Sequence, residues 1–183
     1  MDMKFDTTRP YYPNILTISG TGRNVGKTTL ACSIIKKIAQ NARVTAIKIT
    51  PHFHAVDYQS SLLEKPGIYK VYQEDSKDGD KDSSRMLAAG ADRVLYVQTI
   101  EEYLDDLWKE ISGFVNKESP VIIESGGIHN AIKPGIALLL TDNGQLGDKH
   151  FIQEEYIEIR SSENPVESIL DRINYTGGQW KYK

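Results

Sequence analysis

The residues best suited to chemistry in this chain lie at positions 20–28, where three glycines precede a Lys-Thr pair in the segment GTGRNVGKT. Glycine tolerates positive φ angles and close backbone approach, so consecutive N–H groups in such a loop can point at phosphate oxygens. Lys27 would reach the terminal phosphates of a nucleotide, and the Thr28 hydroxyl would coordinate Mg²⁺. We predict that this loop binds a nucleoside triphosphate together with Mg²⁺. The contributing residues are expected to be Gly20, Thr21, Gly22, Arg23, Asn24, Val25, Gly26, Lys27, Thr28 and Thr29.

The glycine spacing departs by one residue from the pattern G-x-x-x-x-G-K-[ST] that is typical of nucleotide phosphate loops. That pattern would place its first glycine at Thr21, whereas the chain has Gly20, so five residues separate the outer glycines. A loop one residue longer can still wrap a triphosphate. The Gly-Lys-Thr group also stands where an apolar run gives way to a helical pattern, and the positive end of a helix dipole there would favour an anion.

Three charged residues elsewhere in the chain could complete such a site. Glu124 ends an apolar run, a position from which an acidic residue reaches the water shell of the metal. Asp57 is an additional or competing Mg²⁺ ligand, and Lys48 is a second cation for the phosphates. We therefore expect catalytic roles for Lys27, Glu124 and Asp57. The expected metal ligands are Thr28, Glu124 and Asp57.

Two histidines, His52 and His54, are two residues apart, so in an extended segment both side chains would project to one side. Such a pair could hold zinc, but the sequence offers no third and fourth ligand nearby, and the single cysteine, Cys32, lies within a helical pattern. A polar pair that lines the site or is solvated is the favoured interpretation. His54 and Asp57 are equal candidates for a general base.

The elements that must hold these residues follow an alternation of strand and helix. Residues 14–19 form a β-branched apolar run, and apolar residues recur at helical spacing over 27–40. The strand predicted at 43–49 should run parallel to the first strand without having to be its direct neighbour. The other predicted elements are strands at 67–74, 92–99, 120–125, 135–141 and, at a sheet edge, 155–160; a helix at 82–90; a helix with a Thr99–Glu102 capping box; and a helix with Asn164 as cap and Pro165 as first residue.

This alternation predicts an α/β fold of three layers with a mostly parallel central sheet, and with the glycine loop it predicts a P-loop NTPase fold. Ligands in such folds bind at the carboxyl ends of the strands. Residues 20–28, 48–54 and 124–127 each follow a predicted strand directly. We therefore expect these three segments to converge in space.

Length and composition narrow the range of partners. The chain has 183 residues, enough for one domain over 1–183, with an N-terminal arm at 1–13, an insertion at 58–80 and a C-terminal tail at 174–183. A net charge of −3 gives no basic face for nucleic acid. The single cysteine excludes an internal disulfide, and no apolar run has the length of a signal peptide or a membrane span. We expect a cytoplasmic protein with no membrane partner.

Two longer segments resemble the MobB-type proteins, which are P-loop GTP-binding factors that assist the synthesis of molybdopterin-guanine dinucleotide. These segments are AIKITPHFHAVD at 46–57 and GDKDSSRMLAAGADRVLYV at 79–97. The resemblance implies GTP in preference to ATP, slow intrinsic hydrolysis, and a protein partner that uses the nucleotide-bound state. The preference for GTP comes from this resemblance alone, because Thr141 and Asp142 lack the lysine that accompanies them in guanine-recognition segments.

The glycine spacing, by contrast, is similar to that of dethiobiotin synthetase, whose loop also has five residues between its outer glycines. This similarity implies an ATP-dependent ligase or kinase that acts on a small metabolite, with the histidine segment and the 58–80 insertion forming the acceptor pocket. A third hypothesis is a nucleotide-gated interaction module, in which the insertion binds a partner protein or a second copy of the chain as a homodimer. The chain departs from the MobB pattern mainly on the substrate side, at Thr50-Pro51 and at ESGGIHN over 124–130.

Overall fold

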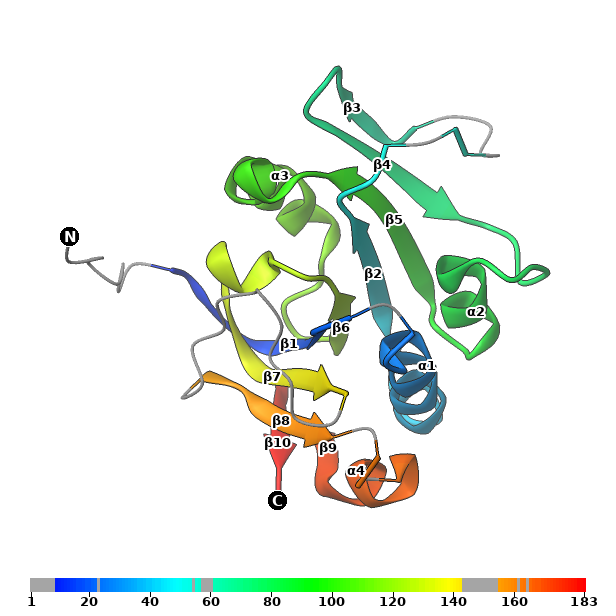
Figure 1. Cartoon of the computed structure of the whole chain (residues 1–183), viewed down its shortest axis with the longest axis vertical. Helices are drawn as coiled ribbons and strands as arrows, with labels where there is room; N and C mark the ends of the chain where they lie inside the picture. The colour runs from blue at the N-terminus through cyan, green and yellow to red at the C-terminus, as the bar shows by residue number, and fades with distance from the viewer. Residues whose placement is uncertain are drawn as a thin grey trace.

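An eight-stranded sheet forms the centre of the computed structural model, which describes residues 9–22, 24–53, 55–56, 61–142, 155–160, 162–163 and 165–183 (Figure 1). Its strands are β1 (Tyr11–Gly20), β2 (Thr45–Thr50), β3 (Leu63–Lys65), β4 (Tyr69–Glu74), β5 (Arg93–Thr99), β6 (Val121–Glu124), β7 (Lys133–Thr141) and β8 (Ile157–Arg160). They lie in the order β3-β4-β5-β2-β6-β1-β7-β8. The pairs from β5 to β8 are parallel, whereas β4 is antiparallel to both β3 and β5. The prediction of an α/β fold with a mostly parallel sheet is confirmed.

Helices cover both faces of this sheet. They are α1 (Lys27–Ile38), α2 (Asp82–Ala88), α3 (Leu104–Ile111) and α4 (Val166–Arg172), with 3₁₀ turns η1 (Glu101–Tyr103), η2 (Ser112–Phe114) and η3 (Ile128–Asn130). Successive strand residues point to opposite faces, so Leu16 and Ile122 pack in the cluster of α1, α2 and α4, while Ile15 and Ile123 pack with α3. No helix in the described part of the chain is long and apolar enough to span a membrane. This arrangement is compatible with a three-layer α/β fold.

The strand that ends in Glu124 lies between β1 and β2. β6 is parallel to both neighbours, and Glu124 is in register with Ile18 of β1 and with Lys48 of β2. The prediction that β2 runs parallel to β1 is therefore confirmed, and β6 lies between the two strands. This strand order brings the glycine loop after β1 and the polar end of β6 side by side at the carboxyl edge of the sheet (Figure 1).

The predicted 58–80 insertion extends the sheet where the structure describes it. The strand expected at 67–74 is present as β4, and β3 pairs with it as an antiparallel hairpin at the sheet edge. Glu74, the last residue of β4, is buried and accepts hydrogen bonds from the hydroxyls of Ser83 (2.7 Å) and Ser84 (3.1 Å). These bonds fasten the start of α2 to the sheet.

The predicted C-terminal tail is an ordered hairpin. It consists of β9 (Ile173–Thr176) and β10 (Gln179–Tyr182) in antiparallel pairing. Trp180 is buried on the cluster that contains α1, and its indole N–H donates to the Asn14 carbonyl at 2.8 Å. The segment predicted as a tail at 174–183 is thus a folded hairpin that Trp180 anchors to the domain.

Three predicted boundaries differ from the structure. β1 begins at Tyr11, so the arm expected to reach residue 13 ends earlier. Thr99 closes β5 and donates its hydroxyl to the Ile68 carbonyl at 2.9 Å, so the predicted capping box with Glu102 does not form; η1 begins only at Glu101. Pro165 precedes α4 instead of opening it, and Asn164 lies outside the described residues.

Candidate functional site

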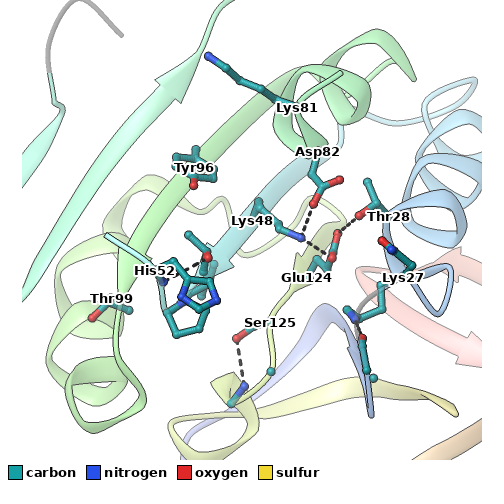
Figure 2. Close-up of a pocket in the computed structure, with 18 of the residues that line it drawn as sticks. Lys27, Thr28, Lys48, His52, Lys81, Asp82, Tyr96, Thr99, Glu124 and Ser125 are labelled. Atoms are coloured by element: carbon teal, nitrogen blue, oxygen red, sulfur yellow. Dashed lines mark hydrogen bonds and ion pairs between the residues drawn. The ribbon is translucent and has the colours of Figure 1, made fainter. Parts of the chain in front are cut away.

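The three segments expected to converge meet in one cleft of about 1130 Å³ at the carboxyl edge of the sheet (Figure 2). Its walls come from the loop after β1, the ends of β2 and β5, the start of α2, and the loop after β6. The convergence of these segments is confirmed. Of the predicted site residues, Gly20, Thr21, Gly22, Asn24, Gly26, Lys27, Thr28, Thr29, Lys48 and Glu124 line the cleft.

The glycine loop turns tightly from β1 into α1. Gly26, which precedes α1, has φ 94°, and Asn24 has φ 60°, so both residues adopt left-handed conformations. At Gly20 a Cβ would lie only 2.9 Å from the Val25 side chain and 3.0 Å from that of Lys27. Glycine at position 20 therefore lets the longer loop fold back on itself, which explains how five residues fit between the outer glycines.

The first two residues of α1 face different parts of the site. The Lys27 ammonium donates to the Gly22 carbonyl at 2.5 Å, so its side chain bends back over the loop. The Thr28 hydroxyl is buried and donates to Oε2 of Glu124 at 2.8 Å. A hydroxyl and a carboxylate from two separate elements are thus held next to each other at the start of a helix.

Lys48 connects two acidic residues across the floor of the cleft (Figure 2). Its ammonium lies 2.5 Å from Oε1 of Glu124 and 2.6 Å from Oδ2 of Asp82. The Glu124 side chain is only 2% exposed, that of Lys48 15% and that of Asp82 37%. Arg85 lies on the outer side of Asp82, with a nitrogen 3.7 Å from Oδ1. Both Glu124 oxygens therefore have partners, one neutral and one charged.

The ion pairs determine the protonation states of Lys48 and Asp82. Burial by itself would lower the pKa of Lys48, but attraction and hydrogen bonding to Glu124 and Asp82 outweigh it, so the pKa is raised. For Asp82 burial would raise the pKa, but the hydrogen bond and charge of Lys48 outweigh it, so the pKa is lowered. Lys48 is accordingly protonated and Asp82 ionised at neutral pH.

Sheet register explains why Lys48 and Glu124 meet. Paired residues of neighbouring strands point to the same face of a sheet, and one row contains Ile18, Glu124, Lys48 and Tyr96. Ile18 packs in the cluster of α1 and α2, so the polar members of the row lie on that face too. The start of α1 and the start of α2 then bring Thr28 and Asp82 toward the row.

Some predicted residues do not reach the cleft. Val25 packs its side chain against the core instead of lining the cleft, so any contact with a ligand would come from its backbone. Arg23, His54 and Asp57 lie outside the described residues. His52 lines the cleft and lies on its side opposite Lys27 (Figure 2).

Asp82 is the principal residue that sequence reasoning missed as a member of the site. Its position depends on β4, which runs antiparallel and ends at the amino edge of the sheet. The segment 75–81 must return toward the carboxyl edge so that α2 can lead down to β5. The direction of β4 is not readable from its residue pattern. A signal was present in Lys81-Asp82-Ser83, which belongs to the MobB-like pattern.

The donor set fits a hard divalent cation better than zinc. In the described part of the chain, no group of three or more His, Cys, Asp or Glu side chains gathers to hold a metal. The Thr28 hydroxyl and Glu124 carboxylate are hard oxygen donors 2.8 Å apart. Mg²⁺ prefers such oxygens and usually completes its shell with phosphates and water, so the pair suits a metal that arrives with a nucleotide.

The chain was compared with protein-family models, with curated proteins and with solved structures, and none of the three comparisons found a match. Similarity to a known protein therefore gives no independent indication of the ligand. What the cleft binds must be inferred from the side chains and backbone that form it.

Proposed function

We propose that this chain is a P-loop nucleoside triphosphate-binding protein that holds Mg²⁺-nucleotide at residues 20–28. The observation that carries the proposal is the direct bond between Thr28, the second residue of α1, and Glu124, the last residue of the neighbouring strand β6. A phosphate loop needs this combination of glycine turn, lysine, hydroxyl and strand-end acid in one place.

Each residue then has a distinct task. Loop N–H groups and the start of α1 attract the phosphates, and Lys27 leaves the Gly22 carbonyl to contact the terminal phosphate. Thr28 ligates Mg²⁺ and Glu124 orients the metal's water shell, with Asp57 a further candidate ligand. Bound Mg²⁺ neutralises charge that develops on the phosphates. Lys48 pairs with Glu124 and holds its carboxylate in place.

The first candidate for the biological role is a GTP-binding adaptor of the MobB type in molybdenum cofactor biosynthesis. It follows from the resemblance of the segments 46–57 and 79–97. Slow hydrolysis, a protein partner, a cytoplasmic location and the absence of a nucleic-acid partner belong to this proposal. The described cleft is lined by Lys48, Asp82 and Arg85 from those two segments.

A second candidate is an ATP-dependent enzyme that acts on a small metabolite. The extent of the cleft favours it, because the cleft continues from the glycine loop across the ends of β2 and β5 as far as Glu101 and Leu104. Its volume of about 1130 Å³ exceeds the usual range for one ligand, about 300–1,000 Å³. A nucleotide would leave room at that end for a second molecule.

The nucleotide proposal is tested by titrating the full chain with a fluorescent GTP analogue in the presence of Mg²⁺. We expect saturable binding with a Kd on the order of 1 μM, competed by unlabelled GTP more strongly than by ATP. Removal of Mg²⁺ with EDTA should weaken binding about tenfold or more, because phosphate charge is then uncompensated. A complete lack of saturable binding at millimolar nucleotide contradicts the proposal.

We expect Glu124→Gln to slow turnover more than it weakens binding. Residues that orient a metal's outer shell typically contribute about 10- to 100-fold to activity, so kcat should fall by that factor while Kd changes less than about threefold. Phosphate release and fluorescent nucleotide binding provide the two measurements. Glu110→Gln, at an exposed position on α3, is the matched control and should leave both unchanged. Equal losses in kcat and affinity would make Glu124 an affinity ligand instead.

A further inference from the structure

Glu101 belongs to η1, which follows β5, and it lines the cleft. β2 separates β5 from β6 in the sheet, yet the Glu101 side chain reaches the loop that follows β6. The Asn130 side-chain amide donates to Oε1 of Glu101. A residue of the ESGGIHN segment therefore holds one carboxylate oxygen of Glu101.

Gly127 makes room for this carboxylate. A Cβ at position 127 would lie 2.9 Å from Cδ and 3.0 Å from Oε1 of Glu101, closer than side-chain atoms normally approach. Gly127 is not in the left-handed region, so its backbone conformation alone does not require glycine. The absence of a side chain at this position therefore serves the placement of Glu101 in the cleft.

The charged residues of the cleft come from different elements. Lys27 and Arg85 lie at the glycine loop and α2, and Lys48 is paired there with Asp82 and Glu124, whereas Glu101 comes from the turn after β5. Glu101 has no ion-pair partner among the residues that the structure describes. Glu101 is exposed to solvent, and the buried apolar residues Leu104 and Ile49 line the same cleft.

We propose that Glu101, Asn130 and Gly127 form a subsite that binds a small organic molecule through a positively charged nitrogen, an ammonium or guanidinium group. A fixed carboxylate oxygen accepts a charge-assisted hydrogen bond from such a group more strongly than from a neutral donor. The inference rests on the proposed nucleotide function in one respect, which is that the rest of the bound organic molecule would extend toward the nucleotide phosphates.

The size of this ligand is limited by the cleft, which has a volume of about 1130 Å³ and would also hold the nucleotide. The room left beside a nucleotide suits a small molecule and not a macromolecular partner.

The test is a titration of the full-length, ¹⁵N-labelled chain with n-butylamine, followed by the amide signals of Gly126 and Gly127, without any nucleotide. n-Butanol, which has the same shape and no charge, is titrated in parallel. We expect saturable shifts at both glycines with n-butylamine and none with n-butanol. Glu101→Gln should weaken n-butylamine binding about tenfold or more, because the charge-assisted hydrogen bond is lost.

Gly127→Ala tests the position of Glu101 without changing its charge. Gly127→Ala should displace the flexible end of Glu101 and weaken n-butylamine binding comparably, because the added Cβ contacts side-chain atoms and not backbone. Gly113→Ala is the matched control, since its Cβ meets nothing within 4 Å. Glu102→Gln, also exposed but outside the cleft lining, is the matched control for charge. Both controls should bind n-butylamine as the unaltered protein does.

The proposal is overturned if the unaltered protein shows no saturable shift at Gly126 and Gly127, or if Glu101→Gln binds n-butylamine with unchanged affinity. Binding of the fluorescent GTP analogue is measured separately on the same variants and should stay within about twofold of the unaltered protein. The amine titration contains no nucleotide, so its result can be interpreted even if the protein does not bind nucleotide. The two proposals can thus fail independently.

Discussion

Lys27→Ala is expected to weaken Mg²⁺-nucleotide binding by about 100-fold or more. A hydrogen bond to a charged group contributes about 1.5–3 kcal/mol, and an ammonium at the terminal phosphate would make more than one such contact. A 100-fold loss corresponds to about 2.7 kcal/mol. Titration with the fluorescent GTP analogue measures the effect, and micromolar affinity retained in the variant would contradict the placement of the phosphates at residues 20–28.

The same substitution should leave the fold intact. The Lys27 side chain is only partly buried, and its ammonium donates to the Gly22 carbonyl within the loop, so its removal opens no cavity in the core. Lys36→Ala is the matched control because Lys36 is exposed on the same helix. We expect the free energy of unfolding of both variants to lie within about 1 kcal/mol of that of the unaltered protein. Nucleotide affinity should be lost only in Lys27→Ala. If the Lys27→Ala variant is unfolded, its loss of nucleotide affinity cannot be assigned to a missing contact with the phosphates.

The sequence predicted the parallel strands well because these strands are buried on both faces. Runs such as residues 120–125 and 135–141 are apolar at nearly every position, which is the signature of a strand covered on both sides. The glycine loop and Glu124 follow such runs directly, so their convergence at one sheet edge followed from the fold class alone.

Features that depend on the direction of a strand or on distant contacts were harder to predict. Asp82 reaches Lys48 only because β4 is antiparallel, and Glu101 reaches the cleft through contacts with Asn130 and Gly127 on another loop. Neither contact can be read from the local residue pattern, although Lys81-Asp82-Ser83 lies in a segment that resembles the MobB-type proteins. The C-terminal hairpin did have a local signal, since Gly177-Gly178 separates two short runs with aromatic residues, a common hairpin pattern.

Lys48→Met is expected to destabilise the protein by about 3–5 kcal/mol. Removing one partner of a buried ion pair leaves the other charge without compensation, and that cost is typically of this size. The cost arises at Glu124, whose side chain is 2% exposed, and much less at Asp82, which water can solvate. Urea unfolding followed by circular dichroism measures the change. Lys117→Met, at an exposed position, is the control and should change the free energy of unfolding by less than about 0.5 kcal/mol.

The double variant Lys48→Met/Glu124→Gln distinguishes an uncompensated charge from simple loss of packing. Glu124→Gln alone leaves Lys48 paired with Asp82, so it should cost less than Lys48→Met. In the double variant no buried charge remains at position 124, while the Thr28 hydroxyl can still donate to the amide oxygen of the substituted side chain. We therefore expect the double variant to be more stable than Lys48→Met alone, with a coupling free energy of about 2–3 kcal/mol. Strictly additive effects would mean that Lys48 acts through packing and not by neutralising Glu124.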